Sequence, residues 1–362
     1  MKYRFIILGA LASAAILGWL VFRNLGPLLR VVSDIHRGYA ALAFLCAFAA
    51  YGMIGMALWE VLRLSGYRRP FSEVCGIAFV STSANYFVSS MGVSGFALKA
   101  HLLRKRNVPF GATVTASVVT TALMYAVLGV IILQGLLYYM VRLHGTHIQV
   151  LEGVLGLALL GMTSVPLLLI FFHREVRSHL VRRTFHWMSM ASFKLAQKEI
   201  PHEDFQTFER QLNQGLDTIR ASRGGLTITL AYTCLDWALT MAVLYFGFRA
   251  VGAHMTVGHL SAGFAVGMAC TLIPLLPGGL GAMEASMAAV FARMGTDWET
   301  ALVAVLLYRM AYYVVPGIVS VFLLWGLKMS EPAWVETTVS ETLPEELALS
   351  DWERDRREEP RG

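Results

Sequence analysis

Long apolar runs without charged residues are the feature that most constrains how this chain can fold. Several of them exceed the roughly 18 residues that cross the hydrocarbon core of a bilayer. Only 15% of all residues are charged, against about 25% in soluble domains. Backbone groups in lipid must be satisfied internally, and these runs lack the alternation of barrel strands. The sequence therefore predicts an all-α integral membrane protein.

The runs, and the basic residues between them, predict a topology. Six full-length transmembrane helices are expected at residues 5–22, 39–62, 110–140, 150–172, 226–249 and 300–327. Lys2 and Arg4 precede the first run, which we interpret as an uncleaved helix with a cytoplasmic N-terminus. The loop 173–225 contains nine Lys or Arg residues, as is typical of cytoplasmic loops. We expect a multi-pass protein of the bacterial inner membrane with both termini in the cytoplasm.

Two further apolar segments, 72–98 and 258–294, are interrupted by polar residues or by Pro and Gly. If segment 72–98 crossed the membrane once, the basic cluster from Lys99 to Arg106 would lie outside, against the positive-inside rule. A segment that enters and returns keeps this cluster inside, and its Ser, Asn and Gly residues suit a broken membrane helix. The sequence therefore predicts two re-entrant helical hairpins in addition to the six spans.

The order of these segments repeats within residues 1–330, which we expect to form one membrane domain. The halves, about 39–140 and 226–327, each contain a span, a hairpin and a span. Glycines lie 186 residues apart in the two halves, Gly92 with Gly278 and Gly95 with Gly281. Because the two opposed hairpins would enter from opposite faces, the halves form an inverted repeat, which is typical of secondary transporters.

Three charged residues inside predicted membrane segments are the main candidates for function: Asp236, Glu284 and Arg309. Each costs about 2.5 to 3.5 kcal/mol at the bilayer centre on insertion scales, so we expect them to be paired. Arg309 could bind a lipid phosphate while the two carboxylates hold its guanidinium group. A structural cluster that only ties the second hairpin to the last span is the alternative.

The breaks of the two hairpins supply further candidates. The Gly-rich run 277–281 leaves backbone N–H groups at the start of the next helix, and such a terminus attracts anions. A turn that only reverses the chain would explain the same run. In the first half, Asn85, Ser94 and Lys99 could contact a lipid head group. Asn and Ser could equally bond broken backbone, and Lys99 could extend to the membrane interface.

Patterns of catalysis or metal binding are missing from the sequence. It contains no HExxH, GxSxG or P-loop motif. The four cysteines lack CxxC spacing, and His144 and His147 have no carboxylate motif nearby. We therefore expect no metal, no cofactor, no catalytic residue and no enzymatic activity.

Charge is distributed unevenly along the chain. Residues 1–330 hold 26 basic and 14 acidic side chains, an excess that suits anionic lipid rather than nucleic acid. Residues 331–362 hold 4 basic and 10 acidic side chains. We expect this acidic tail to be disordered in the cytoplasm.

The second break resembles the signature of a known family. Lysylphosphatidylglycerol synthetases and stand-alone proteins of the UPF0104 type share a flippase-like membrane domain with a Pro-Gly-Gly-x-Gly-x-x-Glu motif. This chain matches that motif at Pro277, Gly278, Gly279, Gly281 and Glu284. An earlier Asn…Gly-Glu-x-x-Arg motif of the family is matched by Asn85, Gly95 and Lys99, whereas Phe96 occupies its acidic position.

The resemblance covers roughly residues 5–328 and implies that a polar-headed lipid moves between leaflets. An aminoacylated phospholipid, a hopanoid or a glycolipid would be such a lipid. Membrane lipids are then the expected partners, and a lipid-modifying synthase is a further candidate partner. The soluble aminoacyltransferase domain of the synthetases has no counterpart in residues 331–362. Two other classes stay open: an accessory subunit of a lipid- or glycan-modifying synthase, and an intramembrane lipid-modifying enzyme that uses Asp236 or Glu284 as acid or base.

Overall fold

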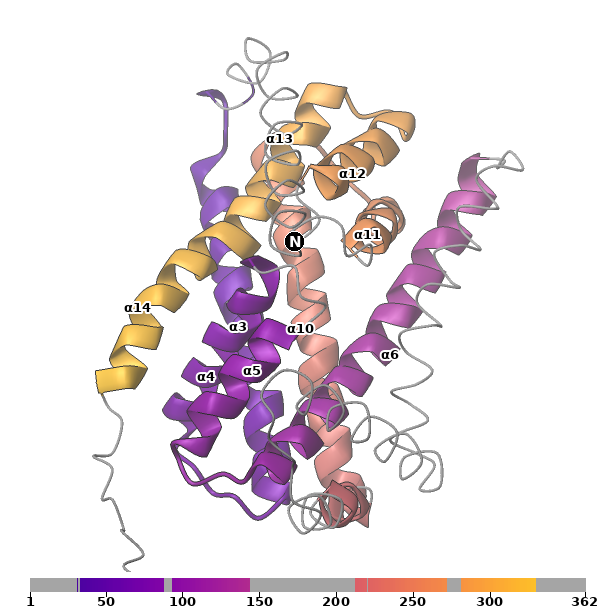
Figure 1. Ribbon diagram of the computed structural model, residues 1–362. Helices are drawn as coiled ribbons and strands as arrows, with labels where there is room; N and C mark the ends of the chain where they lie inside the picture. Colours follow the sequence, from indigo (N-terminus) through magenta and orange to yellow (C-terminus); the bar gives the residue numbers. More distant parts are fainter. Residues whose placement is uncertain are drawn as a thin grey trace, which may run out of the picture. The chain divides into compact units, whose positions relative to one another are not determined.

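All regular structure in the described part of the chain is helical (Figure 1). The computed structural model describes residues 33–87, 93–143, 212–219, 221–271 and 281–329, together with residue 31. The all-α class is therefore confirmed for these ranges. The predicted spans 5–22 and 150–172, the loop up to residue 211 and the acidic tail lie outside the described residues.

Four helical stretches are long and apolar enough to cross a membrane. They are α3 (Arg37–Leu64), α6 (Phe110–Leu143), α10 (Arg223–Ala250) and the continuous run of α13 (Trp298–Arg309), η2 (Met310–Val314) and α14 (Val315–Met329). A helix of 28 residues, such as α3, is about 42 Å long, more than the roughly 30 Å of a hydrocarbon core. These stretches contain the four remaining predicted spans, so the chain is a multi-pass membrane protein by length and composition.

The first interrupted segment consists of two helices, α4 (Phe71–Phe87) and α5 (Val93–Arg104), that run in opposite directions. At one end, the Gly95 N–H donates to Asn85 Oδ1 at 2.7 Å. At the other end, Arg106 Nε lies 3.1 Å from Glu73 Oε2. Helix α5 continues past residue 98, the expected end of the hairpin, because Leu102 and Leu103 are buried. Lys99 therefore lies within the hairpin rather than in the loop after it.

The second interrupted segment has the same construction, with α11 (Val257–Thr271) and α12 (Ala282–Arg293) packed side by side. Two glycines on α11 lie against large side chains of α12. A Cβ atom on Gly263 would lie 2.2 Å from the Phe291 ring, and one on Gly267 would lie 2.4 Å from Met287 Cγ. Since the residue number rises on α11 while it falls on α12, the two helices are antiparallel, and small residues allow their close approach.

The helices that begin the two halves, α3 and α10, also run in opposite directions. The His36 N–H at the start of α3 donates to the Ala250 carbonyl at the end of α10, at 2.8 Å. At the other end, a Cβ atom on Gly225 would lie 2.5 Å from Leu64 Cδ1. Each helix has 28 residues. Two helices of equal length therefore lie together with reversed polarity.

The hairpins begin at opposite ends of this pair. Hairpin α4–α5 follows the end of α3, and Arg106 at its base donates to the carbonyl of Leu327 near the end of α14. Hairpin α11–α12 follows the end of α10, and its Gly258 contacts Tyr138 in the last part of α6. Helix α6 packs against α11, and α14 packs against α4. The final helix of each half thus covers the hairpin of the other half.

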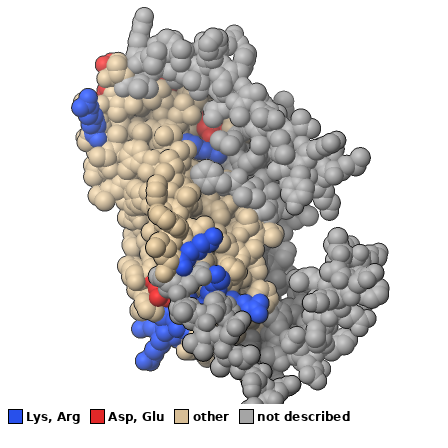
Figure 2. All heavy atoms as spheres, turned by 60° about the vertical axis from the view of Figure 1, so that its left-hand side comes forward, with Lys and Arg blue, Asp and Glu red and all other residues tan. Residues whose placement is uncertain are grey.

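Much of the surface is neither basic nor acidic. On the face shown in Figure 2, most described side chains are uncharged, and Lys and Arg gather mainly toward its lower end. Large apolar side chains of α14 are strongly exposed, including Val321, Phe322 and Trp325 at 65% to 67%. Such a surface is typical of a helix that faces lipid.

Candidate functional site

The start of α12 holds the first part of the candidate site. Gly281 precedes the helix with φ of +81°, a conformation that favours glycine. Its N–H donates to Glu284 Oε2 at 2.7 Å. This N–H group, which the sequence places at an anion-attracting terminus, is therefore already bound by a carboxylate of the chain. Pro277, Gly278 and Gly279 lie outside the described residues.

Glu284 also forms an ion pair with Arg309 at the end of α13. Arg309 Nε lies 3.0 Å from Glu284 Oε1, and the two side chains are 7% and 0% exposed. The Arg309 Nη1 group contacts the sulfur of Met283 at 3.3 Å. An unpaired ion would be strongly disfavoured at this depth, so the pair keeps both charges inside the bundle.

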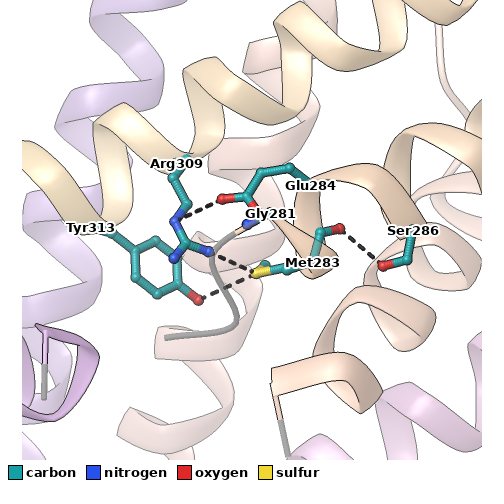
Figure 3. A network of polar contacts seen from close by, with 6 residues as sticks. All are labelled: Gly281, Met283, Glu284, Ser286, Arg309 and Tyr313. Atoms are coloured by element: carbon teal, nitrogen blue, oxygen red, sulfur yellow. Dashed lines mark hydrogen bonds and ion pairs between the residues drawn. The ribbon is translucent and has the colours of Figure 1, made fainter. Parts of the chain in front are cut away.

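Tyr313 completes this cluster (Figure 3). The Arg309 guanidinium lies over the Tyr313 ring, with Cζ 4.5 Å from the ring centroid. The Tyr313 hydroxyl is 4.0 Å from the Met283 sulfur. A cation over an aromatic face is stabilised by the ring's quadrupole, and the stabilisation increases when water is excluded. Arg309 is thus held by a carboxylate and by an aromatic ring.

The Tyr313 ring reaches this position through η2, a π-helical segment between α13 and α14. Such segments are rare and often occur at functional sites. Here the segment brings two consecutive tyrosines, Tyr312 and Tyr313, to buried positions. The Tyr51 hydroxyl on α3 donates to the Tyr312 carbonyl at 3.2 Å. Sequence reasoning missed this cluster, although the run YRMAYY in an otherwise aliphatic helix was its signal.

The tyrosines connect the end of α4 with the start of α12. Tyr86, near the end of α4, packs on Tyr313 with ring centroids 4.5 Å apart. Tyr313 in turn contacts Arg309 and Met283, which belong to α13 and α12. An aromatic contact therefore joins the end of α4 to the charged cluster at the start of α12.

The candidates of the first hairpin have mainly local partners. Asn85 binds the Gly95 N–H, and the Ser94 hydroxyl donates to the Ala84 carbonyl at 3.3 Å. A Cβ atom on Gly95 would lie 2.2 Å from the Ser81 carbonyl oxygen. These contacts close the hairpin. Gly92 lies outside the described residues.

Lys99 and Phe96 give the first hairpin a different character from the second. Lys99 is partly buried on α5, and the structure records no ion pair for it within the described ranges. Phe96, at the position where the family motif is acidic, contacts Phe110 edge to face at 6.0 Å. The first hairpin thus has an aromatic contact at the position where its own family motif is acidic.

Asp236 lies apart from the Arg309–Glu284 pair. It is 5% exposed on α10, and its Oδ1 atom has no hydrogen-bond partner among the residues that the structure describes. Its carboxyl interacts electrostatically with Tyr51 and Tyr312. The expected arrangement, in which both carboxylates hold Arg309, is therefore met by Glu284 alone. No group of three potential metal ligands occurs within the described ranges.

Comparison with known proteins supports a lipid-related membrane function. Residues 6–320 match the family described as the lysylphosphatidylglycerol synthase TM region. A UPF0104 membrane protein of Methanothermobacter thermautotrophicus is 24% identical over 328 residues, which cover 87% of this chain and 91% of that protein. A phosphatidylglycerol lysyltransferase of Staphylococcus aureus (strain COL) is 36% identical over 99 residues, which cover 27% of this chain and 12% of the lysyltransferase.

Proposed function

Because the chain belongs to the lysylphosphatidylglycerol synthase transmembrane-region family, we propose that it moves a polar-headed lipid between the two leaflets of a membrane. The observation that carries the proposal is the buried cluster of Arg309, Glu284 and Tyr313, which contacts the end of α4 and the start of α12, one helix end from each antiparallel hairpin. An intramembrane ion pair at such a junction is typical of a substrate pathway.

The proposed topology has six full-length transmembrane helices and two re-entrant hairpins, with both termini in the cytoplasm of a bacterial cell. Its support is the reversed polarity of α3 and α10 and the start of each hairpin at a different end of that pair. In a membrane, this arrangement makes the hairpins enter from opposite faces. Their breaks then lie near the midplane, where a head group crossing between leaflets has the least contact with water.

Arg309 is the proposed contact for the head group. A lipid phosphate is an anion, and a guanidinium binds phosphate oxygens through planar, charge-assisted hydrogen bonds. Glu284 and Tyr313 hold the guanidinium when no lipid is present. An anionic head group that reaches Arg309 binds a cation that is already shielded from water. The acyl chains of the lipid remain in the hydrocarbon.

An aminoacylated phosphatidylglycerol is the favoured substrate class. Its support is the partial match to a protein named phosphatidylglycerol lysyltransferase. A hopanoid or a glycolipid stays the alternative. The name of the related UPF0104 membrane protein specifies no lipid and therefore does not decide between these classes. We assign the chain no chemical step of its own.

The test is lipid movement by the purified full chain in liposomes that contain fluorescent lysylphosphatidylglycerol. A quencher added outside reports how fast the label leaves the inner leaflet. We expect Arg309→Ala to lower the protein-dependent rate at least about tenfold, since a hydrogen bond to a charged group contributes about 1.5 to 3 kcal/mol. Lys328→Ala, an exposed cation near the end of α14, is the matched control and should keep the full rate. Equal rates for the unaltered chain, Arg309→Ala and empty liposomes would refute the proposal.

A second candidate function is an accessory subunit of a lipid-modifying synthase. The 99-residue match to the lysyltransferase favours it, because that enzyme contains a segment similar to this chain. Crosslinking of the full chain in its native membrane would then recover a fixed synthase partner. Lipid movement by the purified chain alone would argue against it.

A further inference from the structure

The carboxyl group of Asp236 is a buried acid that the proposed phosphate site does not use. The other such acid in the described part of the chain, Glu60, pairs with Arg63 at 2.8 Å. Asp236 is the fourteenth of 28 residues in α10, which is long enough to cross a membrane. It therefore lies at the middle of a membrane-spanning helix. The residue is 5% exposed, and its Oδ1 atom has no hydrogen-bond partner within the described part of the chain.

The groups around Asp236 are neutral. Its electrostatic partners are the phenols of Tyr51 on α3, Tyr86 on α4 and Tyr312 in η2. Helix α11 contains no Lys, Arg, Asp or Glu, and α6 contains only Arg142, near its end. Tyr125 of α6 packs against the same core. The cation of α13, Arg309, is held by Glu284 and Tyr313.

Glu284, the buried acid of the proposed site, has a cation and an N–H donor beside its carboxyl group. Its two oxygens lie 3.0 Å from Arg309 Nε and 2.7 Å from the Gly281 nitrogen. Neither Glu284 Oε1 nor Asp236 Oδ1 has a hydrogen-bond partner among the described residues. Oε1 lies beside the Arg309 cation, whereas Asp236 is similarly buried and has no ion pair among these residues. A buried charge without a partner is strongly disfavoured, and such a group binds a proton instead. The two acids therefore differ in that Glu284 has a cation beside it and Asp236 has none in the described part of the chain.

We propose that Asp236 is a proton-binding site in the middle of the bundle and that its protonation is coupled to movement of the lipid. Only the coupling rests on the proposed function. An O–H bond forms at Oδ1 with a proton from water on one face of the membrane. The same bond breaks when the carboxyl is exposed to the other face, and the proton returns to water there without any transfer of electrons.

The position of Asp236 suits such coupling. Tyr51 and Tyr86 belong to the first half of the chain, whereas Tyr312 belongs to the second. Tyr86 also packs on Tyr313, which holds Arg309. A movement of one hairpin relative to the other changes the surroundings of both Asp236 and Arg309. Proton exchange and phosphate exchange can thus occur in the same rearrangement.

The first test is infrared spectroscopy of the purified full chain at neutral pH, without any lipid substrate. We expect the carbonyl band of a protonated carboxylic acid in the unaltered chain and in Glu284→Gln, and its loss in Asp236→Asn. If Asp236→Asn does not fold, Asp236→Glu should shift the frequency of the band. A missing band in the unaltered chain, or a band that neither substitution at Asp236 changes, would overturn the proposal. This readout does not require lipid movement, so its outcome is separate from that of the proposed function.

The second test is the distribution of fluorescent lysylphosphatidylglycerol between leaflets when a pH difference is imposed across the liposome membrane. If one proton moves for each lipid, the ratio between leaflets shifts about tenfold for each unit of pH difference. Asp236→Asn should give the same ratio with and without the pH difference. An equal shift in the unaltered chain and in Asp236→Asn would overturn the coupling.

Discussion

The two hairpins share a backbone plan but differ in the chemistry of their breaks. In hairpin α11–α12, an acidic side chain of the helix itself, Glu284, binds the Gly281 N–H and also pairs with Arg309. In hairpin α4–α5, a neutral amide, Asn85, binds the Gly95 N–H, and the neighbouring side chain is Phe96. In both hairpins a side-chain oxygen therefore accepts from a glycine N–H. Only in the second hairpin does that side chain also pair with a buried cation. The difference shows that a side chain can close a hairpin without also forming an ion pair.

This comparison predicts that the largest loss of stability follows removal of the charged oxygen. Glu284→Ala leaves Arg309 without its carboxylate and Gly281 without its acceptor. We expect a loss of about 3 to 5 kcal/mol, the usual effect of breaking a buried ion pair. Thermal unfolding of the purified chain in detergent measures it, with Glu299→Ala in the first turn of α13 as the control acid. A loss of stability smaller than that of Asn85→Ala would contradict the claim that the charged side chain stabilises its hairpin more than the neutral one does.

Substitution of Gly95 in the first hairpin should cause the next largest loss of stability. Gly95→Ala places a Cβ atom 2.2 Å from the Ser81 carbonyl oxygen, which is backbone and cannot rotate away. We expect a loss of about 1 to 3 kcal/mol from overpacking. Gly38→Ala, where nothing lies within 4 Å of the new atom, is the matched control on α3. Equal unfolding temperatures for the two variants would contradict the close approach of α4 and α5.

Removal of the neutral Asn85 side chain should lower the stability less. Asn85→Ala removes the acceptor of the Gly95 N–H, which should cost about 1 to 2 kcal/mol as an unsatisfied buried group. Asn85→Asp retains an acceptor at the same place and should recover part of the stability. Hydrogen exchange of the Gly95 amide provides a local readout. Exchange that is equally slow in Asn85→Ala and in the unaltered chain would show that the bond does not close the hairpin.

Removal of the Tyr313 hydroxyl should change the stability least. Tyr313→Phe keeps the ring under the Arg309 guanidinium and removes the hydroxyl, which lies 4.0 Å from the Met283 sulfur and interacts with the Tyr308 side chain. We expect a change below about 0.5 kcal/mol in stability and a nearly unchanged rate of lipid movement. Tyr313→Leu removes the ring face and should lower the rate further. If Tyr313→Phe were as harmful as Tyr313→Leu, the hydroxyl rather than the ring would hold Arg309.

Composition and spacing predict the long helices and the two broken segments because both depend on simple physical patterns. An uncharged run of 20 or more residues has few alternatives to a membrane helix, and Gly or Pro marks a break. The need to neutralise buried charge also predicts that Arg309 has an acidic partner. Charge patterning placed Lys99 after the hairpin, whereas α5 extends to Arg104 because Leu102 and Leu103 are buried.

The tyrosine cluster and the isolation of Asp236 could not be predicted in this way. The π-helical segment changes the register of the last long helix, and no local pattern states which face Tyr312 and Tyr313 will occupy. Likewise, the cost of a buried charge predicts that a carboxylate binds Arg309 but does not decide between Glu284 and Asp236. That choice depends on how α10, α12 and α13 pack, which is a property of the tertiary structure.

Accessibility labelling of single cysteines tests the central claim, that the two hairpins enter the membrane from opposite faces, most directly. In a chain whose native cysteines are replaced, Ser72→Cys and Arg104→Cys mark the base of the first hairpin, and Thr256→Cys and Arg293→Cys mark the base of the second. All four positions are exposed. We predict that an impermeant thiol reagent labels the first two positions from the cytoplasmic side and the last two from the other side. Labelling of Ser72→Cys and Arg104→Cys from different sides, or of all four positions from the same side, would contradict the account.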